Sequence, residues 1–196
     1  MTSAPRRVVV GISGASGVIY GIRLLEALRQ DAAIETHLVI SPAGRITIAQ
    51  ETAWSVGQVE ALADVAHKPE NIGASIASGS FATLGMAIVP CSIKSLSAVA
   101  HSYADDLLVR AADVTLKEGR PLVLVVRETP LHLGHLRLMV QAAELGAVIL
   151  PPMPAFYSRP QSLDDIINET VGRILLRLGI DNGLYFEWLG LRGSRE

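Results

Sequence analysis

Cysteine, charge and long apolar runs are all scarce in this chain of 196 residues. Cys91 is the only cysteine, so no disulfide can form within the chain, and a reducing compartment is its natural setting. No apolar stretch approaches the roughly 20 residues that span a bilayer. We therefore expect a cytoplasmic protein without membrane insertion.

The balance of charge argues against nucleic acid as a partner. Lys and Arg number 17 and Asp and Glu 19, which gives a net charge of −2, and no basic run stands out. Charged residues make up only 18% of the chain, below the roughly 25% of typical domains. So little charge predicts exposed apolar patches, which the contacts of a homo-oligomer would cover.

The alternation of short apolar runs with helical patterns predicts one α/β domain with a doubly wound, Rossmann-like fold. The six strands should be mostly parallel, because their runs are apolar throughout rather than alternating. We expect strands at 8–13, 36–41, 63–67, 86–90, 122–127 and 147–150. We expect helices at 18–30, 46–54, 95–102, 106–117, 132–145 and 163–178. This domain would fill residues 1–180, and a tail over 181–196 would pack on a neighbouring subunit.

Ligands in such folds bind beyond the carboxyl ends of the strands. After the first strand comes a Gly-rich turn, 11–17, which suits either a nucleotide loop or an ordinary tight turn. Neither a Walker A loop nor the GxGxxG spacing is present. Ser41 ends the second strand, and Glu51 on the next helix matters only if it lies near this cleft.

The segment after the fourth strand combines Ser92, Lys94 and Ser95 with the start of a helix, which suits a phosphate. Simple helix capping by Ser92 or Ser95 would explain one hydroxyl but not the whole cluster. Cys91 could be a nucleophile, but a small packing residue beside a buried strand is the better interpretation.

The fifth and sixth strands deliver further polar groups. Arg127 and Glu128 follow five apolar residues, where Arg suits a phosphate or flavin carbonyl and Glu suits proton transfer. The proline-rich loop 151–160 presents Tyr157, and Arg173 on the last helix could hold a phosphate with it. His132 and His135 lack the partners of a zinc site, so no metal is expected.

These segments together resemble the UbiX family of flavin prenyltransferases. The shared pattern covers almost the whole chain in order, with compatible spacing. It comprises residues 11–17, 90–95, 110–114, 116–118, 127–132, 154–157 and 173–175. Ile72 and Ala74 stand where some members of the family have a tryptophan.

The resemblance implies a reaction. A UbiX-like enzyme joins the dimethylallyl group of dimethylallyl phosphate to N5 and C6 of reduced FMN, without a metal. The product, prenylated FMN, serves a UbiD-type decarboxylase in ubiquinone synthesis or aromatic-acid metabolism. The family usually assembles as a dodecamer.

The resemblance also implies roles for individual residues. Those for binding FMN are Gly14, Ala15, Ser16, Ser41, Ser92, Ile93, Lys94, Ser95 and Arg127. Those for the prenyl donor are Lys117, Arg127, Tyr157, Arg173 and Trp188, some of them from neighbouring subunits. Those with catalytic roles are Ser16, Glu51, Lys117 and Glu128. For Trp188, simple packing of an apolar tail is an equal alternative.

Two other functions stay open at this point. An FMN-dependent decarboxylase of cysteinyl substrates would share the fold and the cofactor, and a non-catalytic flavin carrier would need only the flavin site. The combination of Lys117, Glu128, Tyr157 and Arg173 favours the prenyltransferase, because neither alternative needs cations for a second phosphate.

Overall fold

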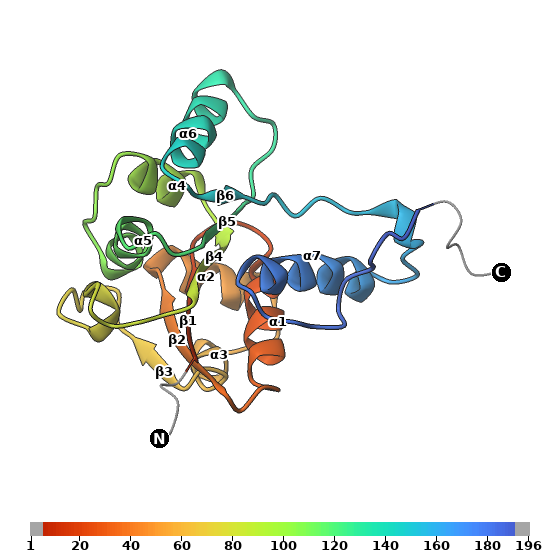
Figure 1. Cartoon of the computed structure of the whole chain (residues 1–196), viewed down its shortest axis with the longest axis horizontal. Coiled ribbons are helices and arrows are strands. Elements are labelled where there is room, and N and C mark those ends of the chain that lie inside the picture. Colours follow the sequence, from red (N-terminus) through yellow and green to blue (C-terminus); the bar gives the residue numbers. More distant parts are fainter. Residues whose placement is uncertain (1–5, 191–196) are drawn as a thin grey trace.

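The computed structural model describes residues 6–190, which form a six-stranded sheet in the order β3-β2-β1-β4-β5-β6 (Figure 1). Every neighbouring pair of strands is parallel, as the sequence predicted. The strands are β1 Arg6–Ile12, β2 Ile34–Ile40, β3 Val65–His67, β4 Gly85–Cys91, β5 Leu122–Val126 and β6 Val148–Ile149. All six coincide with predicted strands, within a few residues at each end.

Helices cover both faces of the sheet, which explains why the strands are apolar throughout. Alternate residues of β1 enter separate cores: Val8 and Val10 pack with α1 and α7, whereas Val9 packs with α4, α5 and α6 (Figure 1). The helices are α1 Val18–Leu28, α2 Pro42–Glu51, α3 Val56–Glu60, α4 Ile93–Ala100, α5 Leu107–Lys117, α6 Leu133–Glu144 and α7 Leu163–Arg177. Short 3₁₀ turns, η1 Ser75–Ala77 and η2 Phe156–Ser158, lie in the connections.

Local capping accounts for several helix ends. Ser162 accepts a hydrogen bond from the backbone N–H of Asp165 at the start of α7, and Gly179 follows this helix with a φ of +71°. A positive φ costs glycine little, so both ends of α7 were predictable.

Two helical predictions were wrong. The helix predicted at 46–54 is α2, which starts at Pro42 because Ser41 caps it and proline suits the first helical position. The short α3 was not predicted, although Ser55 and Gln58 form a capping box at its start.

The strand order reverses between β1 and β4, so the turns that follow these two strands flank the crevice where a ligand is expected. Residues 181–190 fold back along α7 of the same chain (Figure 1), while 191–196 lie outside the described residues. The tail's contact with a neighbouring subunit stays a prediction. None of the helices within residues 6–190 is long and apolar enough to cross a membrane.

Candidate active site

The Gly-rich turn after β1 lies tightly against the start of α2. A methyl group at Gly14 would overlap the side chain of Ala43, so only glycine fits here. Gly17 has a φ of +97°, a left-handed conformation that other residues adopt only with strain. Ala15 and Ser16 lie between these glycines, and Ser16 is exposed. The turn therefore brings backbone N–H groups to the edge of the crevice without bulky side chains.

Glu51 lies beside this turn, which sequence alone could not establish. Its Oε2 accepts a hydrogen bond of 2.8 Å from the backbone N–H of Gly17, at the N-terminus of α1. A carboxylate is favoured there by the partial positive charge of the helix end. Ser41 directly follows β2 and caps α2, and its backbone N–H donates to Ile12 O at 2.9 Å.

Ser13 joins the two turns that flank the crevice. Its side chain is 1% exposed. Its hydroxyl donates to Pro90 O at 2.9 Å and accepts from the backbone N–H of Ser92 at 2.8 Å. The sequence analysis assigned no role to Ser13, although a hydroxyl directly after an apolar strand was a usable signal.

The start of α4 carries the predicted cluster of polar groups. Ser92 caps the helix by accepting from the backbone N–H of Ser95 at 3.2 Å, which confirms the capping role. Lys94 is exposed and Ile93 half-buried. Burial raises the pKa of the Cys91 thiol to about 12, so it stays protonated and the packing interpretation is preferred to a nucleophile.

Arg127 and Glu128 follow β5 at the same edge of the sheet. The backbone N–H of Arg127 donates to Cys91 O at 3.1 Å, which ties it to the α4 turn. Both side chains are exposed, and Glu128 Oε1 accepts from the backbone N–H of Thr129 at 3.0 Å. The ends of β1, β2, β4 and β5 thus gather their predicted residues into one group, here called the carboxyl-edge cradle.

The carboxyl-edge cradle fits a phosphorylated flavin. It combines backbone N–H groups at helix starts, serine hydroxyls and the cations Lys94 and Arg127, which suit a phosphate. The position that a Cβ of Gly14 would occupy is filled by Ala43, so the turn is held against the start of α2.

A second group lies at η2, α7 and the tail. Arg173 Nη1 donates to the Tyr157 hydroxyl at 3.3 Å, as the sequence predicted. The Tyr157 ring lies 6.0 Å from the Phe186 ring and 5.6 Å from the Trp188 ring, measured between centroids. A pocket of about 600 Å³ opens between these side chains. This arrangement, here called the aromatic pocket, offers one cation beside an apolar wall.

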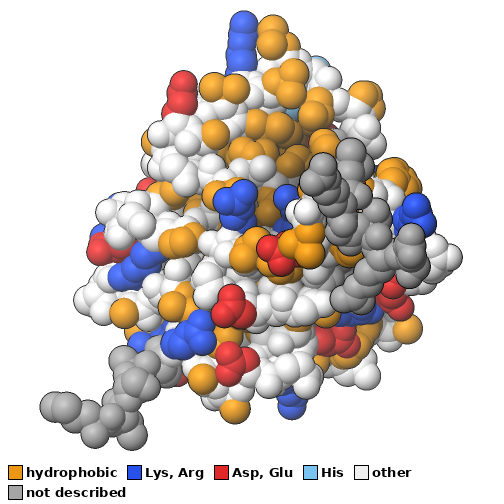
Figure 2. All heavy atoms as spheres, turned by 45° about the vertical axis from the view of Figure 1, so that its right-hand side comes forward, with side chains coloured by type: hydrophobic (Ala, Val, Ile, Leu, Met, Phe, Trp, Pro, Cys, Tyr) orange, Lys and Arg blue, Asp and Glu red, His pale blue; other side chains and the backbone are white. Residues whose placement is uncertain are grey.

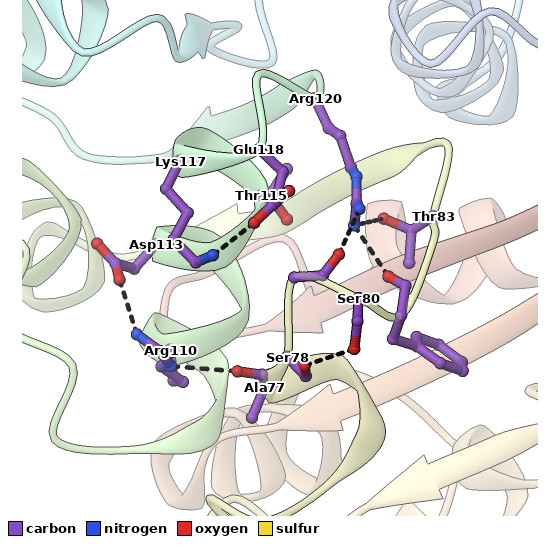
Figure 3. A network of polar contacts seen from close by, with 12 residues as sticks. Ala77, Ser78, Ser80, Thr83, Arg110, Asp113, Thr115, Lys117, Glu118 and Arg120 are labelled. Atoms are coloured by element: carbon purple, nitrogen blue, oxygen red, sulfur yellow. Dashed lines mark hydrogen bonds and ion pairs between the residues drawn. The ribbon is translucent and has the colours of Figure 1, made fainter.

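Lys117 belongs to neither group. It ends α5, at the amino edge of the sheet, and pairs with Glu118, whose pKa this hydrogen bond lowers (Figure 3). Roughly 16 Å of strand separates this edge from Arg127, at about 3.3 Å per residue of β5. The side chains of Arg110 and Arg120 lie on the same side, against the loop 77–83 (Figure 3). No hydrogen bond or ion pair within residues 6–190 joins Lys117 to the carboxyl-edge cradle or the aromatic pocket.

Histidines form no recognisable metal site in this part of the chain. The rings of His132 and His135 lie 3.6 Å apart between centroids. Within residues 6–190, no group of three or more His, Cys, Asp and Glu side chains could hold a metal ion.

Comparison with known proteins decides the family. Residues 1–175 match the protein family described as Flavoprotein. Flavin prenyltransferase UbiX of Escherichia coli K12 is 65% identical over 187 residues, which cover 94% of this chain and 99% of the relative. The chain belongs to the UbiX-type flavin prenyltransferases.

Two solved structures are similar to this flavin prenyltransferase. The crystal structure of AnUbiX (PadA1) in complex with FMN and dimethylallyl pyrophosphate has a TM-score of 0.92 and 47% identity, covering 95% of this chain and 99% of that one. A dodecameric FMN-dependent Ubix-like decarboxylase from Escherichia coli O157:H7 has a TM-score of 0.91 and 47% identity, covering 94% and 100%. The doubly wound fold and the family resemblance expected from the sequence are both confirmed.

The single chain of this flavin prenyltransferase thus divides the predicted site residues among three places. The carboxyl-edge cradle holds the residues expected to bind FMN, together with Ser16, Glu51 and Glu128. The aromatic pocket holds three residues expected to bind the donor, and Lys117 lies at the opposite edge of the sheet.

Proposed function

We propose that this enzyme transfers a dimethylallyl group from dimethylallyl phosphate to N5 and C6 of reduced FMN, with prenylated FMN as the product. The observation that carries the proposal is a second anion-binding group besides the carboxyl-edge cradle: Arg173, hydrogen-bonded to Tyr157 and walled by Trp188. A flavin carrier has no use for such a group. The structure of AnUbiX in complex with FMN and dimethylallyl pyrophosphate supports a flavin and a dimethylallyl ester as the two ligands, and the monophosphate as donor is part of the proposal.

The carboxyl-edge cradle holds the flavin in this proposal. Gly14, Ala15 and Ser16 line the ring, while the starts of α2 and α4 offer N–H groups and the hydroxyls of Ser41 and Ser92. Both hydroxyls accept a capping hydrogen bond; the Ser92 hydroxyl also donates to Ser95 Oγ at 3.2 Å, whereas the Ser41 hydroxyl donates to no group within residues 6–190 and can donate to an anion. Further contacts come from Ile93, Lys94, Ser95 and Arg127. Reduced FMN, when bound, supplies the nucleophilic nitrogen and carbon of the reaction.

Cations stabilise the leaving phosphate. Negative charge develops on the phosphate as the allylic C–O bond breaks, and fixed positive charges lower the energy of that transition state. Arg173 and Arg127 supply these charges, together with Lys117 of a neighbouring subunit, and the Tyr157 hydroxyl donates a hydrogen bond to the phosphate. Trp188 and Tyr157 exclude water and stabilise the allylic cation through their ring faces.

Three groups are placed to move protons. Glu51 Oε2 is fixed by Gly17, whereas Oε1 makes no hydrogen bond within residues 6–190 and is available to accept a proton. Ser16 lies one residue before Gly17, and its hydroxyl can relay a proton to Glu51 Oε1. Glu128, at the end of β5, would protonate the leaving phosphate.

An oligomer follows from this arrangement, since Lys117 lies far from the carboxyl-edge cradle of its own chain. The exposed side chains of Leu133, Leu136 and Val140 make the outer face of α6 apolar, and hydrophobic side chains gather over the upper half of the molecule in Figure 2. A homo-oligomer, as in the dodecameric structural relative, would cover them.

We place the enzyme in the cytoplasm, where a UbiD-type decarboxylase receives the product.

The test is anaerobic incubation with reduced FMN and dimethylallyl phosphate, followed by mass spectrometry of the flavin and an assay for free phosphate. We expect a flavin heavier by one prenyl unit and one phosphate per flavin. Lys117→Ala should lower kcat/KM about 100-fold, while Gln30→Ala, an exposed change after the end of α1, should leave it unchanged.

Two outcomes would contradict the proposal. Decarboxylation of a cysteinyl substrate without any prenyl donor would assign the enzyme to the cysteine decarboxylases. Tight FMN binding with no chemistry in the wild type, and with Glu51→Gln indistinguishable from it, would leave a flavin carrier. Activation of an apo UbiD-type decarboxylase by the reaction mixture tests the recipient separately.

A further inference from the structure

The tail over residues 181–190 is held on α7 by specific hydrogen bonds. The Asn182 side-chain amide donates to Gly172 O at 3.1 Å and to Ile180 O at 3.2 Å. The backbone N–H of Leu184 donates to Asn182 Oδ1 at 3.0 Å. The backbone N–H of Phe186 then donates to Glu169 Oε2 at 2.7 Å. The tail therefore has a defined seat on the helix.

The missing side chain of Gly172 leaves space for the tail to lie against α7. A methyl group at Gly172 would lie 2.7 Å from the backbone nitrogen of Tyr185 and 2.9 Å from Asn182 Oδ1. Both distances are too short for a carbon atom, and Asn182 is fixed by its hydrogen bonds to Gly172, Ile180 and Leu184. Glycine in the middle of a helix is unfavourable, so its presence here is explained by the close approach of the tail.

Glu169 contacts the tail and lies close to Arg173, one of the residues that line the aromatic pocket. The residue is 7% exposed, although it lies one turn from the exposed Arg173. Its Oε1 makes no hydrogen bond within residues 6–190 and lies 3.8 Å from Arg173 Nη1. Phe186 is the tail residue that Glu169 contacts. Two residues further along the tail, the Trp188 ring packs against the Tyr157 ring. One buried carboxylate thus contacts the parts of the chain that form both sides of the pocket.

We propose that Glu169 and Gly172 are positioning residues, which dock the tail on α7 and so place Trp188 beside Tyr157 and Arg173. Neither residue touches the prenyl donor in this proposal. Its catalytic consequence rests on the function proposed above, but its structural consequence does not. The acceptor oxygen of Glu169, rather than its charge, is the feature that docks the tail.

Three variants of the full-length protein separate these roles. Glu169→Gln keeps an oxygen for the Phe186 N–H, Glu169→Leu removes it, and Gly172→Ala fills the seat while favouring the helix itself. Asp181→Asn, an exposed change in the same tail, is the matched control. Hydrogen–deuterium exchange of the 184–188 peptide reports docking, and the KM for dimethylallyl phosphate reports the pocket.

We expect exchange of the 184–188 peptide to rise at least tenfold in Glu169→Leu and Gly172→Ala and to stay near wild type in Glu169→Gln and Asp181→Asn. The KM for the donor should rise about tenfold in the first two variants, whereas the affinity for FMN should not change. Gly172→Ala keeps the test valid if Glu169→Leu fails to fold.

Unchanged exchange in Gly172→Ala would overturn the docking role. Increased exchange with an unchanged donor KM would overturn the positioning role. If wild-type protein transfers no prenyl group, the proposed function fails, while the exchange data still decide whether these residues dock the tail.

Discussion

Ser13 shows how much one buried hydroxyl contributes to the crevice. Ser13→Ala leaves the Ser92 N–H without its acceptor and Pro90 O without its side-chain donor, and an unsatisfied buried group costs about 1–3 kcal/mol. We expect the free energy of unfolding to fall by that amount in urea titrations and the affinity for FMN to fall about tenfold. Ser13→Thr keeps the hydroxyl and should stay close to wild type. Equal FMN affinity in all three proteins would contradict this role.

His67 provides a prediction about pH. Burial, and secondarily the neighbouring His37, lower the pKa of His67 below its ordinary value of 6.5. His37 Nδ1 lies 2.9 Å from His67 Nε2, and His37 Nε2 lies 2.7 Å from Glu35 Oε1, so His37 is already engaged on both sides. The unfolded chain therefore binds a proton more readily than the folded one, and the contribution of His67 to stability is lost as the pH falls below about 6.5.

The test is the free energy of unfolding between about pH 7 and pH 5. Its decline on acidification should be smaller in His67→Gln than in wild type. His101→Gln serves as the control, because among the described residues that exposed ring has a single hydrogen-bond partner, Ser97 O. A decline in His67→Gln as steep as in wild type would show that the pKa of His67 is not lowered.

At the level of elements, the sequence predicted the strands better than the helices. The central strands β4 and β5 are buried along their whole length because helices cover both of their faces, and such apolar runs can be found without knowing the strand order. The helix α2 buries only Gly44 and Ile48, so its hydrophobic pattern is weak and its start could be found only from Ser41 and Pro42. The five residues of α3 are too few for any period to emerge.

The packing of α2 against the Gly-rich turn gives a prediction at this scale. Gly14→Ala would force apart Ala43 and the turn after β1, and such overpacking costs about 1–3 kcal/mol. We expect a lower free energy of unfolding and weaker FMN binding. Gly57→Ala on α3 is the matched control, because a methyl group there meets nothing within 4 Å and should stabilise by about 0.5–1 kcal/mol. Equal stability of the two variants would show that the turn adapts to the extra methyl group.

At the scale of the whole molecule, the site could be predicted only in part. Residues that directly follow strands meet at one edge of a parallel sheet, and the hydrogen bonds between Ser13 and Ser92 and between Arg127 and Cys91 join the ends of β1, β4 and β5. Glu51 lies beside them through the packing of α2, which no local pattern encodes. The position of Lys117 at the opposite edge follows from the direction of α5, so its proposed role at the donor requires contacts between subunits.

Mixing two inactive variants tests whether Lys117 of one subunit acts in the site of another. Lys117→Ala and Arg127→Ala each remove one cation from every site, so each protein alone should lose most of its activity. If a site takes Lys117 from one subunit and Arg127 from another, co-expression of the two variants gives some sites with both cations intact. Random assembly predicts activity in about a quarter of the sites, since each intact residue is present with a probability of about one half. If Lys117 instead served the site of its own chain, every site would lack one cation, and the co-expressed oligomer would be as inactive as either variant alone.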